Sequence, residues 1–120
     1  MKKSTKDHQG AVLYLRVASA DQQDQRDGIA EQRAVCTRQA ERLGVVVTDE
    51  YVDAGASGNN KDRGGLRRLL ASVRQRPVRY VIVRDRTRLS RNPADDATIR
   101  ERIEQDGATI VSAADKRSPR

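Results

Sequence analysis

The sequence predicts an α/β fold, a three-layer sandwich with a mostly parallel central sheet. Short apolar runs rich in β-branched residues alternate along the chain with longer segments of helical periodicity. The connections between the apolar runs are too long for hairpins, which favours parallel pairing through right-handed crossovers. With 120 residues the chain is long enough for one hydrophobic core and too short for two. We therefore expect helices on both faces of a single sheet.

The first half of the chain predicts a strand, a helix and a second strand. Residues 11–17 form a short apolar run, and we expect a strand there. Residues 18–28 are polar, and we expect a mobile loop that leads into a helix. The pattern then becomes helical, and one stripe of the helix comprises Ile29, Gln32, Cys36, Ala40 and Leu43. Gly44 ends this helix, and residues 45–52 predict the second strand.

The next segment repeats this order of loop, helix and strand. Residues 53–60 contain glycines and asparagines, which indicates a turn-rich loop whose backbone N–H groups suit an anion. Residues 63–76 predict a helix, which Pro77 ends. Its inner face comprises Leu66, Leu69, Leu70 and Val73. Residues 78–83 predict the third strand.

The last part of the domain predicts one more helix and strand. Pro93 suits the first turn of a helix, and Gly107 stops that helix. Its expected apolar contacts are Ala97, Ile99 and Ile103, and residues 108–111 predict the fourth strand. We expect a disordered leader over residues 1–10, one domain over 11–112 and a basic tail over 113–120.

Composition restricts the classes of partner and cofactor. The net charge is +7, and the basic residues are 19 arginines and 5 lysines. This excess of arginine favours an anionic partner. A GC-rich coding bias would also raise the arginine content. Cys36 is the only cysteine, so no intramolecular disulfide forms, which fits the cytoplasm. The sequence contains no membrane-spanning apolar run and neither of the two glycine-rich nucleotide-binding signatures. Asp21, Asp24 and Asp27 lack the glycine and glutamate that complete a calcium loop, so we expect no cofactor and no metal.

A cluster of arginines follows the third predicted strand. It comprises Arg84, Arg86, Arg88 and Arg91. Open α/β sheets bind ligands at the carboxyl ends of their strands, and guanidinium groups match phosphate oxygens in geometry. Arg16 after the first strand and Arg63 at a helix start are expected at the same edge, accompanied by Ser19, Ser57 and Ser90. A serine hydroxyl among guanidiniums suits phosphoryl transfer without a metal.

These residues resemble the catalytic domain of the serine recombinases, the resolvase and invertase family. Order and spacing agree over residues 11–112. The matching pieces are Tyr14-Leu15-Arg16-Val17, then Gln32, then Asp53 with Ser57-Gly58 and Arg63, and finally Arg88-Leu89-Ser90-Arg91-Asn92.

The resemblance implies a resolvase-like fold and DNA strand exchange through a phosphoserine. A serine attacks the phosphodiester, becomes linked to the 5′ phosphate and frees a 3′ hydroxyl. The residues implied to hold the scissile phosphate are Arg16, Arg63, Arg88 and Arg91, and those implied to bind DNA or support the site are Ser57, Gln32, Arg84, Arg86 and Asp53. The implied partner is double-stranded DNA, with self-association or a recombinase partner open, and with no membrane and no small-molecule cofactor.

The sequence departs from the family pattern at two positions. Ala18 stands where strict spacing places the nucleophile, and Ser19 follows it. If one residue is inserted, Ser19 is the nucleophile, and the aspartate and glutamines that follow fit the family pattern. Thr87 replaces the family's aspartate, for which Asp85 could partly substitute, and Ser90 is expected to help start the next segment.

Two functions therefore stay open from the sequence. The first is a recombinase catalytic domain, and the alternative is a catalytically inactive module that binds DNA or a recombinase partner and regulates it. Family members continue into a long dimerising helix and a DNA-binding region, so we expect either a fragment of a longer recombinase or a stand-alone relative.

Overall fold

The structure is a computed structural model that describes residues 10–17, 22–54, 64–85, 88–90 and 92–114. The side chains of residues 22–27 and 54 lie outside this description. The expected leader at residues 1–9 and most of the expected basic tail, residues 115–120, also lie outside it.

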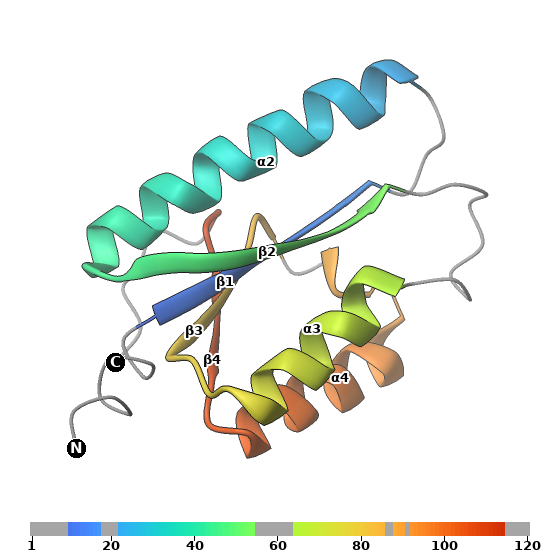
Figure 1. Cartoon of the computed structure of the whole chain (residues 1–120). Coiled ribbons are helices and arrows are strands. Elements are labelled where there is room, and N and C mark those ends of the chain that lie inside the picture. Colours follow the sequence, from blue (N-terminus) through green and yellow to red (C-terminus); the bar gives the residue numbers. More distant parts are fainter. Residues whose placement is uncertain (1–9, 18–21, 55–63, 86–87, 91, 115–120) are drawn as a thin grey trace.

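Four parallel strands form one sheet with helices on both faces (Figure 1). The elements are β1 (Gly10–Val17), α2 (Gln22–Leu43), β2 (Val46–Ala54), α3 (Gly64–Gln75), β3 (Tyr80–Val83), α4 (Pro93–Gln105) and β4 (Thr109–Ser112). The strand order is β2-β1-β3-β4, and every neighbouring pair is parallel. Helix α2 covers one face, and α3 and α4 lie together on the other (Figure 1). This arrangement confirms the predicted three-layer α/β fold.

The largest difference from the predicted elements is the start of α2. The helix begins at Gln22, inside the stretch for which the sequence predicted a loop up to Gly28. Its first residues are polar and supply no apolar stripe, so periodicity shows only the part from Ile29 onward. Strand β3 begins at Tyr80, two residues later than expected. The prediction for Ala97 was wrong: it is exposed, whereas Ile103 carries the core contact of α4.

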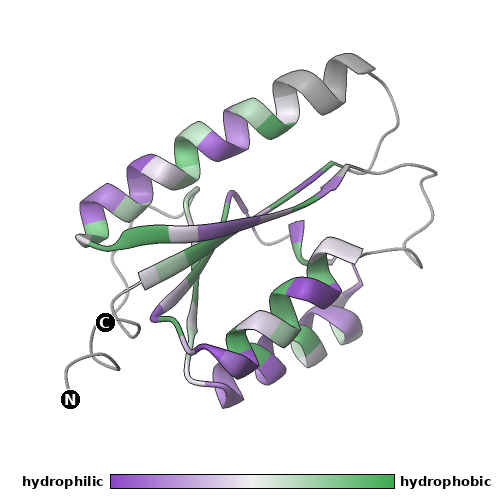
Figure 2. Ribbon diagram, viewed as in Figure 1, coloured by the Kyte–Doolittle hydropathy of each residue, from purple (hydrophilic) through white to green (hydrophobic). Residues whose placement is uncertain are grey.

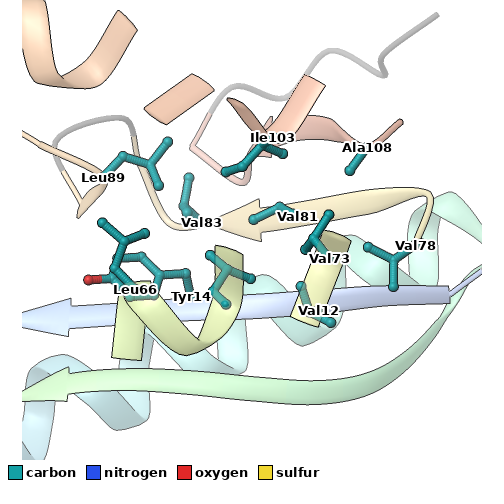
Figure 3. Packing of buried hydrophobic residues seen from close by; sticks show 11 residues of the cluster. Val12, Tyr14, Leu66, Val73, Val78, Val81, Val83, Leu89, Ile103 and Ala108 are labelled. Carbon is teal, nitrogen blue, oxygen red and sulfur yellow. The ribbon is translucent and has the colours of Figure 1, made fainter. Parts of the chain in front are cut away.

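Strand β1 separates two hydrophobic clusters because its side chains alternate between the faces of the sheet. All eight of its residues are buried, as expected for a central strand of a parallel sheet. Val12 and Tyr14 point toward α3 and α4, where they join residues such as Leu66 and Val73 (Figure 3). Leu13 and Leu15 point toward α2 and pack with residues such as Cys36 and Ala40. In this pattern Arg16 lies on the α3 face.

The strand order reverses between β1 and β3. The crossover through α2 places β2 on one side of β1, whereas the crossover through α3 places β3 on the other. A reversal of this kind opens a crevice at the carboxyl ends of the two strands, where α/β folds bind ligands. The last residue pair between β1 and β3 is Leu13 with Ile82, although β1 continues to Val17. The end of β1 therefore projects past β3 into this crevice.

A close approach of α2 to the end of β1 depends on Gly28. A Cβ at this position would lie 2.7 Å from Val17 Cγ1. We expect Gly28→Ala to lower the free energy of unfolding by about 1 kcal/mol, because the overlap outweighs the gain in helix propensity. In a Val17→Ala background the same change is expected to be stabilising. Urea denaturation of the four proteins of this cycle measures the reversal of sign, and equal effects in both backgrounds would contradict it.

None of the helices within the described ranges is both long enough and apolar enough to cross a membrane.

Candidate active site

Arg16 and Arg88 meet at the carboxyl edge of the sheet, where β1 extends past its last residue pair with β3. Arg88 Nη1 donates to the Arg16 carbonyl at 3.0 Å, and Arg16 Nη1 donates to the Arg88 carbonyl at 3.5 Å. Arg16 is 6% exposed, and the Arg88 side chain is 23% exposed. The two residues are 72 positions apart in the chain, so only the fold brings them together. Each guanidinium is held against the other residue's backbone at the ligand edge of the sheet.

Gln32 fixes the projecting end of β1. Its Oε1 accepts from the Arg16 backbone N–H at 3.1 Å, and its Nε2 donates to the Arg16 carbonyl at 2.9 Å. The side-chain amide thus replaces the strand partner that β3 does not provide at this level. Gln32 is completely buried. Of the two roles implied for Gln32, binding DNA and supporting the site, its buried position fits the second.

Asp85 and Leu89 hold the loop that carries Arg88. Asp85 Oδ2 lies 3.4 Å from Arg88 Nε, and the Arg88 N–H donates to the Asp85 carbonyl at 3.1 Å. Leu89 is 1% exposed and packs in the α3 and α4 cluster beside Val83 (Figure 3). Asp85 thus places a carboxylate beside Arg88, and its partial substitution for the family's aspartate at Thr87 stays a prediction. Leu89 gives this polar loop a hydrophobic anchor.

Asp53 lies near the end of β2, and its side chain caps the start of α3. Its Oδ1 accepts from Gly65 N at 2.8 Å, and its Oδ2 accepts from Leu66 N at 3.0 Å and from Tyr14 Oη at 2.6 Å. The first turn of α3 has no acidic residue, so this carboxylate satisfies helix N–H groups and the helix dipole. A Cβ on Gly65 would lie 2.7 Å from the Val52 carbonyl, and only glycine permits the approach. Asp53 therefore ties β1, β2 and α3 together beside the site.

Removing the Asp53 carboxylate is expected to destabilise the domain. We expect Asp53→Ala to lower the free energy of unfolding by about 2–4 kcal/mol, because two helix N–H groups and the Tyr14 hydroxyl lose their acceptor. Tyr14→Phe alone is expected to cost about 1–2 kcal/mol and to cost less in the Asp53→Ala background. Urea denaturation measures both effects. Asp49→Ala, an exposed change on the same strand, is the control, and a loss of similar size there would contradict the assignment.

Arg84 lies apart from the Arg16–Arg88 pair. Its Nη2 is 3.5 Å from Glu31 Oε2 of α2, so it belongs to the other face of the sheet. Ser90 Oγ accepts from Asn92 N at 3.1 Å, and Asn92 Oδ1 in turn accepts from the first N–H groups of α4. The prediction that Ser90 helps start the next segment is confirmed.

Several predicted site residues lie outside the described part of the chain. They are Ser19, Ser57, Arg63, Arg86 and Arg91, together with Ala18 and Thr87 at the two departures from the family pattern. Their roles stay predictions. Where the chain is described, no group of three His, Cys, Asp or Glu side chains is arranged to hold a metal ion.

Cys36 lies inside the α2 cluster and is chemically protected. It is completely buried, and this burial raises the pKa of its thiol to about 12, with Arg84 opposing the shift and Asp85 adding to it. We expect Cys36 to react with iodoacetamide at pH 8 only after unfolding, because the thiolate is the reactive form. Mass spectrometry of the native and urea-unfolded protein measures the difference. Rapid labelling of the native protein would contradict the burial.

Comparisons with known proteins agree with this architecture. Residues 11–120 match the family model described as the resolvase N-terminal domain. The catalytic domain of ISC1926 TnpA, an IS607-like serine recombinase, is 30% identical, with 91% of this chain and 70% of that chain covered and a TM-score of 0.74. The N-terminal catalytic domain of TP901-1 integrase is 28% identical, with 87% and 77% covered and a TM-score of 0.76.

A resolvase family site-specific recombinase from Streptococcus pneumoniae shares the fold. It is 24% identical, covers 88% of this chain and 72% of its own, and has a TM-score of 0.78. A search of curated protein sequences found no match. The family model spans all seven elements, from β1 to β4, including the strands that carry Arg16 and lead to Arg88. The chain therefore belongs to the resolvase family of serine recombinases and spans that family's N-terminal domain.

Proposed function

We propose that this chain cleaves and rejoins double-stranded DNA as the catalytic domain of a site-specific recombinase, with Ser19 as the nucleophile. The observation that carries the proposal is the Arg16–Arg88 pair, which occupies the crevice where the strand order reverses. Ser19 follows the end of β1 by two residues in the sequence, so we expect this serine close to the ligand edge that Arg16 occupies.

The proposed step transfers a phosphoryl group from DNA to the serine. The Ser19 hydroxyl oxygen attacks the scissile phosphorus, forms a new O–P bond and displaces the 3′ oxygen. The hydroxyl proton ends on that oxygen, which leaves a free 3′ hydroxyl and a 5′-phosphoserine. Rejoining is the reverse reaction, in which a 3′ hydroxyl attacks the phosphoserine. One phosphate ester replaces another, so no outside energy source is required.

The arginines serve this reaction by binding the charged oxygens of the phosphate. Arg16 and Arg88 are permanently charged, and their positions are fixed before the substrate arrives, which favours stabilisation of developing charge. We assign the same role to Arg63 and Arg91 from their places in the family pattern. Gln32 and Asp53 act indirectly, because one holds the Arg16 backbone and the other holds the start of α3, directly after Arg63 in the chain.

Exchange between two duplexes requires more than one copy of this domain. Each DNA strand that is cut needs its own nucleophile, and each chain supplies one Ser19. We therefore propose that the chain self-associates, or joins a recombinase partner, when it acts on DNA. A DNA substrate and a reduced, buried Cys36 fit action in the cytoplasm.

The test is to identify the residue that becomes linked to DNA. The full chain is incubated with supercoiled plasmid, the reaction is stopped with detergent, and the covalent product is digested with nuclease and trypsin. Cleavage after Arg16 and Arg26 yields residues 17–26, a peptide in which Ser19 is the only serine. We expect a nucleotide mass on this peptide. A nucleotide on another serine peptide would contradict the nucleophile assignment and leave the recombinase activity intact.

The second candidate function is a non-catalytic module, which Ala18 favours because it stands at the strictly spaced position. Such a module binds DNA or a recombinase partner through the same arginines. If this hypothesis is correct, the chain binds DNA without forming a covalent product. Arg88→Ala then weakens DNA binding, and Ser19→Ala leaves it unchanged.

A further inference from the structure

A second basic surface lies away from the candidate active site, in a groove between α3 and α4. The groove has a volume of about 720 Å³. Its lining residues are Arg67, Leu70, Ala71, Arg74 and Gln75 of α3 and Arg102 of α4. Leu70 is half-buried and Ala71 is exposed, so the floor is apolar, whereas the three arginines on its two sides are all exposed. No carboxylate is among the residues that line the groove.

The charge of α3 differs from that of the other two helices. Helix α3 contains three arginines and no acidic residue, whereas α2 contains four acidic and four basic residues and α4 contains four acidic and two basic residues. Arg74 and Arg102 lie in the last turns of their helices, where a positive charge favours the helix dipole. Arg67 is close to the start of α3, where the dipole disfavours it. The helix dipole therefore favours two of the three arginines along the groove and disfavours the third.

We propose that this groove binds an acidic amphipathic helix of a partner protein. Arg67, Ala71 and Arg74 recur at helical spacing on one side of α3, and Arg102 faces them from α4. An incoming helix would place apolar side chains on Leu70 and Ala71 and carboxylates beside the arginines on both walls. The small side chain of Ala71 permits a close approach of the two helix backbones.

The position of the groove favours a protein helix over DNA. Both helices start at the carboxyl edge of the sheet, and Arg74 and Arg102 lie at their far ends, where both helices are hydrophilic (Figure 2). The nine steps from Gly65 to Arg74 span about 13 Å along the helix axis. The phosphates of a bound duplex would gain nothing from the apolar floor between these arginines.

The chain's own terminal segments do not match the groove in charge. Residues 1–9 carry three lysines and one aspartate, and residues 115–120 carry three basic residues and one aspartate. Both segments are positively charged, as is the groove. Neither segment is therefore assigned as the occupant, and the proposal of a partner helix does not depend on the proposed recombinase function.

The test uses a fluorescent acidic peptide of about four helical turns, with leucines on one face flanked by glutamates. Its binding to the full chain is measured by fluorescence anisotropy. We expect the double variant Arg74→Glu and Arg102→Glu to weaken binding at least about tenfold, and the matched change Arg38→Glu and Arg42→Glu on α2 to alter it less than about twofold. A peptide of the same composition with its leucines dispersed around the helix is expected to bind weakly.

A cysteine reporter locates the bound peptide. Because Cys36 is completely buried, Ala71→Cys places one reactive thiol in the groove, and Ala34→Cys places one on the exposed side of α2 as the control. We expect the peptide to slow alkylation at Ala71→Cys only. Protection at both positions, or equal loss of binding in both double variants, would overturn the proposal by showing non-specific charge attraction. Protection of Ala71→Cys by duplex DNA and not by the peptide would also overturn it, by assigning the groove to DNA.

Discussion

Replacing Ser19 with alanine is expected to abolish the covalent DNA product completely, while DNA binding stays within about twofold of the unmodified chain. In the proposed reaction the hydroxyl oxygen forms the phosphate ester, and no second group can restore it once it is removed. The side chain is small and uncharged, so its loss leaves the electrostatic attraction for DNA unchanged. Electrophoresis in detergent measures the covalent product, and fluorescence anisotropy measures binding.

The matched control for this change is Ser90→Ala. Ser90 also lies in an arginine-rich segment, but its hydroxyl accepts a backbone hydrogen bond at the start of α4. We expect this variant to form the covalent product at a rate near that of the unmodified chain. If Ser19→Ala leaves the yield unchanged, Ser19 is not the nucleophile. If neither protein forms a product while both bind DNA, the non-catalytic module is the better description.

Replacing Arg88 with alanine is expected to lower the rate of covalent product formation about a thousandfold. The change removes a charge fixed near the reacting phosphate, and it also removes one donor to the Arg16 carbonyl. Arg88→Lys keeps the charge but loses the planar donor geometry, so we expect an intermediate rate. The rate under single-turnover conditions measures both effects, and a lysine variant as slow as the alanine variant would indicate that geometry matters more than charge.

The control for Arg88 is Arg79→Ala at the opposite edge of the sheet. Arg79 is exposed and lies over the ring of Tyr80, at 5.3 Å from the ring centroid. We expect its removal to leave the rate of product formation unchanged. The salt dependence of DNA binding provides a second readout, because the loss of one phosphate contact reduces its slope by about one unit. Equal losses of rate in both variants would contradict a specific role for Arg88.

The order of the elements could be predicted because the strands contain short apolar runs, α3 carries an apolar stripe, and Pro93 and Gly107 mark the two ends of α4. The first residues of α2 were missed because nothing in their polar sequence distinguishes a helix from a loop. At the site, the general rule for parallel sheets was enough to bring Arg16 and Arg88 to one edge. The position of Arg84 could have been inferred from strand alternation, because Ile82, two residues earlier, faces α2.

Other features of the site depend on how far each strand extends. Gln32 can bond both backbone groups of Arg16 only because β3 stops pairing with β1 at Leu13. The carboxylate of Asp53 reaches the first turn of α3 only because Gly65 lets that helix approach β2. Strand lengths and close approaches of this kind arise from tertiary packing, so no local sequence pattern indicates them.

The bond between Gln32 and Arg16 has a consequence for the cooperativity of folding. The end of a strand normally frays, because its last backbone groups exchange easily between a neighbouring strand and water. Here the backbone N–H and carbonyl of Arg16, near the end of β1, are hydrogen-bonded by the side chain of Gln32 in the middle of α2. The apolar residues of the same helix pack on that strand. Arg16 cannot be released unless α2 moves away from the sheet. We therefore expect the end of β1 and helix α2 to open together, so that the edge carrying Arg16 shares the stability of the core instead of that of a loop.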